Sequence, residues 1–525
     1  MQSSSHSESA LLMIMFLACL LCLAAHLGSS LASCPKRCTC NFPRLLQCFR
    51  VSDVPGDIPD STRKLYISHS KIKHFQISVF GGMSNLQELA LYSSGIESVD
   101  NNTLKGLSKL KALEVWKNKL TRIPRPLPTD LEVLKLGDNS ISFIFYDDFK
   151  GLKKLRVLEM QNNLIRQLSF NVFSELLNVE SVTLEGNEIE TISGQARLPQ
   201  LRYLNMDNNR LQFFPENFFA YFSSLQYLRM AGNQLLKIPG HLPKTLQHLR
   251  LERNHIKNVK IRDIKHLDNL SELNLSGNQL STADSVQVLS NLSSFDISKN
   301  QIQFLPHKLP TKLQRLDCSN NQISRLTVLN FKNLQSLKHL FLDNNIVSSV
   351  DDNSFHWCVH LSNLAMEQNL LTSLPVGLPV TLTRLDLKGN KIESIGESDV
   401  KGLRKLQVLN LRNNKISLLD HQVLECLPRL RHLYLEGNPW NCTCKLLMVK
   451  RFLIDKGTDI KGGQCAEPSI SRGESWMSSD TILRHCENTF SKSKENKKKL
   501  KIDEFSNMKM QIEDEDDEDY DYDIE

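Results

Sequence analysis

The sequence lacks the motifs that mark an enzyme. It contains no nucleophile motif, no phosphate-binding loop and no set of histidines at metal-ligand spacing. Its 15 histidines are scattered, and several, such as His248 and His339, fall inside the repeat described below. We therefore expect a protein without catalytic residues, metal, cofactor or nucleic-acid partner, which acts by binding other molecules.

Long apolar runs are also scarce, and the one present lies near the start. It extends from Leu11 to Ala25, which suits the core of a secretion signal and is short for a membrane span. No Lys or Arg precedes it, so a signal anchor remains the alternative. No second run follows, and the acidic C-terminus excludes a lipid-anchor signal. We predict a signal peptide over residues 1–33 and a protein secreted, without a membrane anchor, to the extracellular space or extracellular matrix.

What the sequence has in abundance is one repeat. The pattern L-x-x-L-x-L-x-x-N-x-L occurs 17 times between residues 63 and 440, with clear copies at Leu131–Ile141 and Leu406–Ile416. Leucines separated by one residue point to the same side of a short strand, so Leu134 and Leu136 are core and Lys135 faces outward. The Asn ends the strand, and its amide can satisfy backbone groups of the neighbouring repeat that would otherwise be buried without partners.

Stacked units of this kind predict an α/β leucine-rich-repeat solenoid. We expect a curved parallel β-sheet on the concave face, short helical or irregular segments on the convex face, and disulfide caps at both ends. The shorter repeats carry a proline-rich link such as residues 123–128, where a helix cannot continue. The longer repeats carry residues such as Phe149 and Phe173 and have room for a helical turn on the outer face.

Eleven of the 13 cysteines remain after removal of the signal peptide, and eight of them form two clusters. One cluster is Cys34, Cys38, Cys40 and Cys48, and the other is Cys442, Cys444, Cys465 and Cys486. Secretion and position at the ends of the repeats favour disulfides over zinc, with three pairings open for each cluster. Cys318, Cys358 and Cys426 are isolated, and we expect buried, unreactive thiols.

The cysteine spacing and the rough alternation of one short with two long repeats resemble the small leucine-rich proteoglycans. In related modules the first cysteine pairs with the third and the second with the fourth. The resemblance therefore implies the disulfides Cys34–Cys40, Cys38–Cys48, Cys442–Cys465 and Cys444–Cys486. The common members of that family have a two-cysteine C-terminal end with a long "ear" repeat, which this sequence lacks, so their ligand details transfer poorly.

Ligand contacts are expected on the concave face, where residues beside the core leucines face solvent. Its N-terminal half is rich in Tyr, Trp and Arg, which are enriched at binding hot spots. The candidate contact residues are Tyr66, Tyr92, Glu114, Trp116, Lys135, Glu159, Tyr203, Asp207, Tyr227, Arg229 and Arg250. The alternative is that these side chains only cover the strands with a water-facing surface.

Asparagine-linked sugar acceptors predict a glycoprotein. They occur at Asn101, Asn269, Asn274, Asn291 and Asn441. Asn274 falls at a concave strand position, where a glycan would direct ligand contact toward the earlier repeats. Asn441 adjoins Cys442, so a disulfide that forms early could block its modification.

The last 39 residues differ from the rest in charge. Residues 487–525 hold 7 Lys and 14 acidic residues, so the body before them is strongly basic although the whole chain carries only +6. This segment is basic first and then acidic, and has too little apolar content to fold, so we expect a disordered tail. Tyr520 and Tyr522 lie among acidic residues and resemble tyrosine-sulfation sites. The tail could also act only as a solvating segment, bind basic proteins or calcium, or fold back onto the basic body.

These features divide the chain into a signal peptide (1–33), an N-terminal cysteine-rich cap (34–62), seventeen repeats (63–440), a C-terminal cysteine-rich cap (441–486) and the tail (487–525). The family resemblance implies a protein that sequesters growth factors of the transforming-growth-factor-beta class and inhibits their signalling. A structural extracellular-matrix protein that binds collagen or glycosaminoglycan is the alternative. A soluble pattern-recognition or adhesion ectodomain is a third hypothesis.

Overall fold

The structure is a computed structural model that describes residues 34–41, 44–56, 58–76, 83–100, 103–484 and 486. The chain divides into two compact units, residues 1–322 with 329–337 and residues 323–328 with 338–525. Each unit is a stack of short parallel strands, so the predicted leucine-rich-repeat solenoid is confirmed. The predicted signal peptide and the tail lie outside the described residues.

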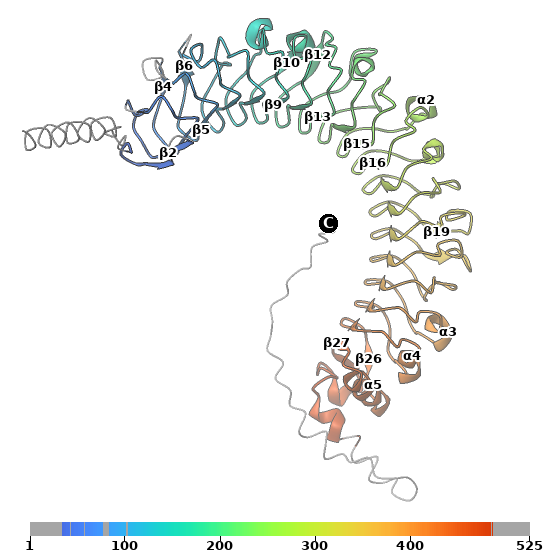
Figure 1. Ribbon diagram of the computed structural model, residues 1–525. Helices are drawn as coiled ribbons and strands as arrows, with labels where there is room; N and C mark the ends of the chain where they lie inside the picture. The colour runs from blue at the N-terminus through green and yellow to red at the C-terminus, as the bar shows by residue number, and fades with distance from the viewer. Residues whose placement is uncertain are drawn as a thin grey trace, which may run out of the picture. The chain divides into compact units, whose positions relative to one another are not determined.

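In the first unit, strands from successive repeats pair side by side and line the concave side of a curved stack (Figure 1). Every pairing is parallel except the one between the first two strands. The strands are β1 (Cys38–Asn41), β2 (Leu45–Phe49), β3 (Lys64–Ser68), β5 (Glu88–Tyr92), β7 (Ala112–Glu114), β8 (Val133–Lys135), β9 (Val157–Glu159), β11 (Ser181–Thr183), β13 (Tyr203–Asn205), β14 (Tyr227–Arg229), β15 (His248–Arg250), β16 (Glu272–Asn274), β17 (Ser294–Asp296) and β18 (Arg315–Asp317).

Burial alternates along each strand, as the repeat predicts. In β8, Leu134 is fully buried, whereas Val133 and Lys135 on either side of it are partly exposed. Leu136, just after the strand, is also fully buried. Because successive side chains of a strand point to opposite faces, this alternation places the leucines in the core and the intervening residues on the concave face.

The repeat asparagines form a ladder of buried hydrogen bonds between neighbouring repeats. Asn163 is typical: its Oδ1 accepts from the backbone N–H of Ile141 at 3.0 Å, and its Nδ2 donates to the carbonyls of Leu136 at 3.0 Å and Met160 at 3.1 Å. The N–H of Ile141 would otherwise be buried without a partner, at a cost of about 1–3 kcal/mol. Each of the two carbonyls accepts from two successive repeat asparagines. At the first repeat Ser70 takes this position, and its hydroxyl accepts from Val51 N–H at 3.1 Å.

The outer side of the first unit is held by buried phenylalanines and short elements. Phe170, for example, packs edge-to-face on Phe173 and Phe218, with ring centroids 5.1 and 4.6 Å apart. The expected helical turns are present as η2 (Tyr146–Phe149), η3 (Phe170–Phe173), η4 (Phe218–Tyr221), α2 (Ile261–Ile264) and η5 (Asp284–Val288). Two short parallel strand pairs also occur there, β4 (His74–Phe75) with β6 (Ser98–Val99) and β10 (Gln167–Ser169) with β12 (Thr191–Ser193). The sequence pattern did not indicate these pairs.

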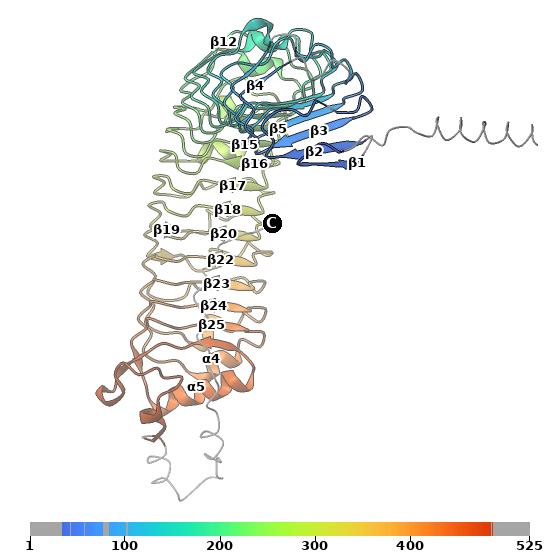
Figure 2. The same cartoon turned by 90° about the vertical axis from the view of Figure 1, so that its left-hand side faces the viewer.

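The second unit repeats the same architecture, and Figure 2 shows its sheet strands side by side. They are β20 (His339–Phe341), β22 (Asn363–Ala365), β23 (Arg384–Asp386), β24 (Val408–Asn410), β25 (His432–Tyr434) and β27 (Asp459–Lys461). The other elements of its repeats are the paired strands β19 (Arg325–Leu326) and β21 (Ser349–Val350), and the helices α3 (Glu397–Val400) and α4 (His421–Glu425).

Both ends of the described chain are closed by disulfide-bonded modules. At the N-terminal end β1 and β2 form an antiparallel hairpin. The C-terminal module comprises β26 (Trp440–Asn441), α5 (Cys444–Asp455), β28 (Cys465–Glu467) and η6 (Ser469–Ser471). The disulfides are Cys34–Cys40, Cys38–Cys48, Cys442–Cys465 and Cys444–Cys486, the same pairs that the family resemblance implies. Trp440 and Trp476 are buried in the C-terminal module, with ring centroids 6.1 Å apart.

Candidate ligand-binding face

A groove of about 1160 Å³ lies on the concave face of the first unit, over the N-terminal hairpin and the first repeats. Its floor comes from β2, β3, β5, β7, β8 and β9. Ala90 and Ala112 lie on this floor, and their small side chains leave space above it. Six candidate residues from the sequence line it: Tyr66, Tyr92, Glu114, Trp116, Lys135 and Glu159. The fold thus brings together residues that are up to 93 positions apart in the chain.

One side of the groove is a ladder of aromatic rings. Phe49, His69, Tyr92 and Trp116 come from four successive strand ends, and neighbouring ring centroids are 5.3, 5.0 and 4.4 Å apart. We call these four residues the aromatic ladder. Phe49 is 48% exposed and His69 is also exposed, so the ladder presents apolar ring surface to solvent. Such rings bury a large area on binding at little entropic cost, because their side chains are already packed.

Two cations border the aromatic ladder. The Lys117 ammonium lies 5.5 Å from the Tyr92 ring centroid and donates to the Tyr92 hydroxyl at 3.2 Å. The Arg50 guanidinium lies 4.9 Å from the Phe49 ring centroid. These contacts hold both cations at the edge of the ring surface.

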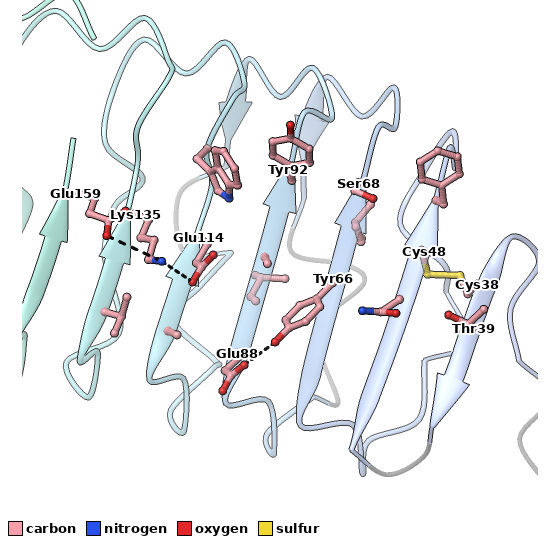
Figure 3. Close-up of a pocket in the computed structure, with 18 of the residues that line it drawn as sticks. Cys38, Thr39, Cys48, Tyr66, Ser68, Glu88, Tyr92, Glu114, Lys135 and Glu159 are labelled. Atoms are coloured by element: carbon pink, nitrogen blue, oxygen red, sulfur yellow. Dashed lines mark hydrogen bonds and ion pairs between the residues drawn. A yellow bond between two sulfur atoms is a disulfide. The ribbon is translucent and has the colours of Figure 1, made fainter. Parts of the chain in front are cut away.

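Charged and polar groups lie along the floor of the groove. Figure 3 shows Lys135 between Glu114 and Glu159, with its ammonium 3.4 and 4.0 Å from their carboxylates. The Tyr66 hydroxyl donates to Glu88 at 2.7 Å, and Lys64 contacts the same carboxylate at 2.8 Å. Aromatic and charged side chains thus lie side by side in one groove, which is the composition of many protein-binding sites.

The Tyr66–Glu88 pair has shifted protonation equilibria. Partial burial and the hydrogen bond to Glu88 raise the pKa of Tyr66 to about 12. Partial burial opposes ionisation of Glu88, but the hydrogen bonds from Lys64 and Tyr66 outweigh it and lower the pKa of Glu88. At neutral pH the tyrosine therefore stays a donor and the glutamate stays an acceptor.

The sequence prediction missed the part of the groove that the N-terminal hairpin provides. Arg37, Thr39, Gln47 and Phe49 all line it. The alternation of buried Leu46 and Cys48 in Leu45–Phe49 follows the strand pattern of the repeats and was the available signal. The cap therefore contributes side chains to the groove as well as closing the end of the core.

The remaining candidates form a second cluster on the concave face of the first unit. Tyr227 stacks on His248 with an interplanar angle of 7° and centroids 4.5 Å apart, and Tyr203 lies next to it at 6.4 Å. The His248 ring and the Arg250 guanidinium both contact Glu272, at 2.9 and 2.8 Å. These residues are at most half exposed, and their side chains are held by one another.

Asp207 corrects one expectation. It was predicted as an exposed contact residue, but its side chain is only 2% exposed. Its carboxylate is directed toward the next repeat, where it accepts from the backbone N–H of Ala231 and from Arg229. Burial raises the pKa of Asp207 in spite of these bonds. Its place is beneath the surface, where it positions Arg229.

The strand face of the second unit carries a different group of charges. The Glu367 carboxyl lies near the Asp386 carboxylate and 4.0 Å from the Lys388 ammonium. Burial and the neighbouring Asp386 carboxylate raise the pKa of Glu367 to about 8. Among the described residues, no group of three or more His, Cys, Asp or Glu side chains is placed to hold a metal ion.

The sugar acceptors differ in their accessibility. Asn269 is exposed, whereas Asn274, Asn291 and Asn441 are partly buried. The Oδ1 of Asn274, on β16, accepts from the hydroxyl of Ser276 at 2.8 Å. The acceptor at Asn101 and the sulfation candidates Tyr520 and Tyr522 lie outside the described residues.

The three isolated cysteines do not share one environment. Cys318 and Cys358 are buried in the core, as predicted, and burial raises the pKa of the Cys358 thiol to about 12. Cys426 is partly exposed, because it directly follows α4 and lines a surface groove together with Glu397 of α3 and Lys401. The expectation of a fully buried thiol at Cys426 is therefore wrong.

The chain is similar to leucine-rich-repeat proteins over most of its length. The family description "Leucine rich repeat" matches residues 60–235, 269–289, 311–371 and 380–439. Mouse nephrocan is 52% identical over 466 residues, which cover 89% of this chain and 91% of nephrocan. The chain belongs to the small leucine-rich proteoglycan family. Mouse podocan is 26% identical over 73% of this chain and 57% of its own length.

The family membership agrees with the fold of known structures. A chain in the solved complex of Drosophila Toll with Spatzle matches this protein with a TM-score of 0.60 and 20% identity. The match covers 86% of this chain and 73% of the chain in the complex. This likeness concerns the solenoid fold alone. No helix within the described residues is both long and apolar enough to cross a membrane. As a member of this family, the protein is an extracellular leucine-rich-repeat protein.

Proposed function

We propose that this protein is a secreted glycoprotein that captures a protein ligand in the N-terminal groove. The observation that carries the proposal is the aromatic ladder beside the groove, a surface of four adjoining rings that is only partly covered by the chain itself. Aromatic side chains dominate the binding energy of many protein interfaces, and contiguous exposed apolar surface marks interaction sites. Substrate turnover has no role in this proposal.

The ligand we propose is a growth factor of the transforming-growth-factor-beta class, which the protein sequesters and so keeps from signalling. The family resemblance supports this choice. The carboxylates of Glu114 and Glu159 share one lysine, so the floor of the groove also suits a basic side chain of the ligand beside its apolar anchor. A structural role in the matrix, through collagen, is the alternative.

The test is direct binding of the purified, secreted full chain to immobilised growth factors of this class and to fibrillar collagen, with a signalling reporter in parallel. Trp116→Ala and Tyr92→Ala should each weaken growth-factor binding by at least about tenfold, which corresponds to about 1.4 kcal/mol. Tyr146→Ala is the matched control, because Tyr146 is an aromatic residue of the first unit that is 63% exposed and lies outside the groove.

The outcomes separate the two functions. Growth-factor binding that falls in the groove variants, but not in the control, together with a matching loss of reporter inhibition, supports the proposal. Binding to collagen alone would assign the protein to the matrix instead. Growth-factor binding that none of the three substitutions changes would remove the groove from the proposal.

A further inference from the structure

A strip of basic side chains lies on the flank of the ninth repeat, outside the groove and independent of the proposed function. Five basic residues occur within ten positions, and all five are exposed: Arg253, His255, Lys257, Lys260 and Arg262. We call these residues the repeat-nine strip. Between them Asn254, Ile256 and Val259 are buried. The buried residues fix the backbone to the core, so the basic side chains are held on the outside.

The preceding repeat extends this basic surface. The backbone N–H of His255 donates to the carbonyl of Leu235 at 2.9 Å, which sets the two repeats side by side. Lys237, two residues after Leu235, is exposed as well. Positive charge therefore continues across two neighbouring repeats.

Several cations elsewhere in the first unit have acidic partners one repeat away. Lys111 contacts Glu132 at 2.8 Å, and Arg156 contacts Glu180 at 2.9 Å. In the repeat-nine strip the ion pair that forms is Arg262 with the adjacent Asp263, at 3.6 Å. Within the part of the chain that the structure describes, Lys257 and Lys260 contact no carboxylate.

This arrangement indicates an external polyanion. Unpaired like charges on one face repel one another and raise the local positive potential, so they favour an anionic partner. The strip spans at most roughly 30 Å at 3.3 Å per residue. None of its five residues lines the N-terminal groove or the groove beside Cys426. Exposed charges at short intervals along the chain fit a flexible, repeating polyanion.

We propose that the repeat-nine strip binds a sulfated glycosaminoglycan chain. Its arginine and lysine side chains contact successive sulfate and carboxylate groups, and the binding releases counterions from the polysaccharide. The strip lies outside the N-terminal groove, so one molecule can hold a protein ligand and a polysaccharide at the same time. Such a surface would retain the protein near its site of secretion.

The test uses the secreted full chain and heparin as the probe. The variant that tests the strip, called the strip variant, carries Lys257→Ala, Lys260→Ala and Arg262→Ala. The matched control carries Lys111→Ala, Lys154→Ala and Arg156→Ala, which remove the same charge from flank residues that pair with Glu132, Asp130 and Glu180. Elution from a heparin column and the salt dependence of the dissociation constant are measured for the parent, the two variants and a chain that lacks Glu513–Glu525, with thermal melts to establish that each is folded.

We expect the strip variant to elute at clearly lower salt, and its slope of log affinity against log salt to fall by on the order of one for each lost contact. The control should remain close to the parent protein. Equal loss in both variants would mean that total charge governs binding, and unchanged elution of the strip variant would exclude the strip as the site. If heparin bound only after deletion of Glu513–Glu525, the occupant of the strip would be the chain's own acidic tail and the proposal would be overturned.

Discussion

The Arg229 guanidinium is fixed by the buried carboxylate of Asp207, with Nε at 2.7 Å and Nη2 at 2.6 Å from the same oxygen, Oδ2. The other oxygen accepts from the backbone N–H of Ala231 at 2.6 Å. The Arg229 side chain is 35% exposed, so one face of the guanidinium remains in contact with solvent. The pair therefore joins two repeats and holds a cation in place on the concave face.

Breaking this pair should destabilise the first unit. We expect Asp207→Ala to lower the free energy of unfolding by about 3 kcal/mol, because it removes a buried acceptor from both Ala231 and Arg229. Arg229→Ala should also destabilise, since it leaves the buried carboxylate without its cation. The combined loss in the double variant should be smaller than the sum of the two single losses, as measured by urea unfolding. Additive losses would show that the two side chains are not coupled.

The asparagine ladder gives a second prediction. Asn163→Ala leaves the buried N–H of Ile141 without a partner and removes one of the two bonds that the carbonyl of Leu136 accepts, so we expect a loss of about 3 kcal/mol in the free energy of unfolding. Asn178→Ala is the control, because Asn178 is exposed and makes one bond, to the carbonyl of Lys153 at 2.8 Å. Circular dichroism during urea unfolding measures both. Similar losses at the two positions would contradict the role assigned to the ladder.

The second unit should lose stability as the pH rises. The pKa of Glu367 is raised from about 4.5 to about 8, so between these values the folded chain holds a proton that the unfolded chain has released. The free energy of unfolding must then fall across this pH window and stay lower above it. Glu367→Gln removes the ionisation, and we expect its Tm to exceed that of the parent by a few degrees at pH 9, with little difference at pH 5.

A matched variant checks this pH dependence. Glu393 lies in the same unit and is exposed, so Glu393→Gln should follow the pH profile of the parent. The comparison uses melting curves at pH 5, 7 and 9. A Glu367→Gln profile parallel to that of the parent would exclude the buried carboxyl as its origin.

The isolated cysteines should differ in reactivity. Alkylation requires the thiolate, and burial raises the pKa of Cys358 to about 12 and that of Cys318 well above its ordinary value. In the folded protein iodoacetamide should therefore modify Cys426 and leave the other two intact until denaturant is added. Mass spectrometry of the peptides gives the positions. Native labelling that persists in a Cys426→Ser variant would contradict the environments described above.

The repeat pattern was enough to predict the strands, the core leucines and the concave register. Leu134, Leu136 and Lys135 lie as the spacing of two requires, because one hydrophobic face fixes the register of a strand. Six of the eleven predicted contact residues meet in one groove for the same reason. A strictly periodic chain allows residues far apart in sequence to be placed on one face.

The pattern was least informative where contacts depend on the reach of individual side chains. Asp207 occupies the same repeat position as Tyr92 and Trp116, yet its short carboxylate turns to the backbone of Ala231 and is buried. Phe49 joins the aromatic ladder because β2 continues the sheet, whereas the N-terminal cysteine cluster suggested only a cap. The spacing of residues in the repeat does not predict the direction in which such side chains turn.

The asparagine ladder also affects the order in which repeats can complete their hydrogen bonds while the chain is being synthesised. The Oδ1 of Asn163 serves Ile141 in the repeat before it, and that of Asn438 serves Ile416 in the same sense, at 3.0 Å in both cases. Each repeat therefore depends on an acceptor supplied by the one that follows. A nascent chain leaves its newest repeat with an unsatisfied donor until the next has emerged. In the last repeat the corresponding N–H, that of Trp440, donates to the carbonyl of Asn438 at 3.0 Å instead. A chain that stops early would therefore expose an unsatisfied donor in its last repeat.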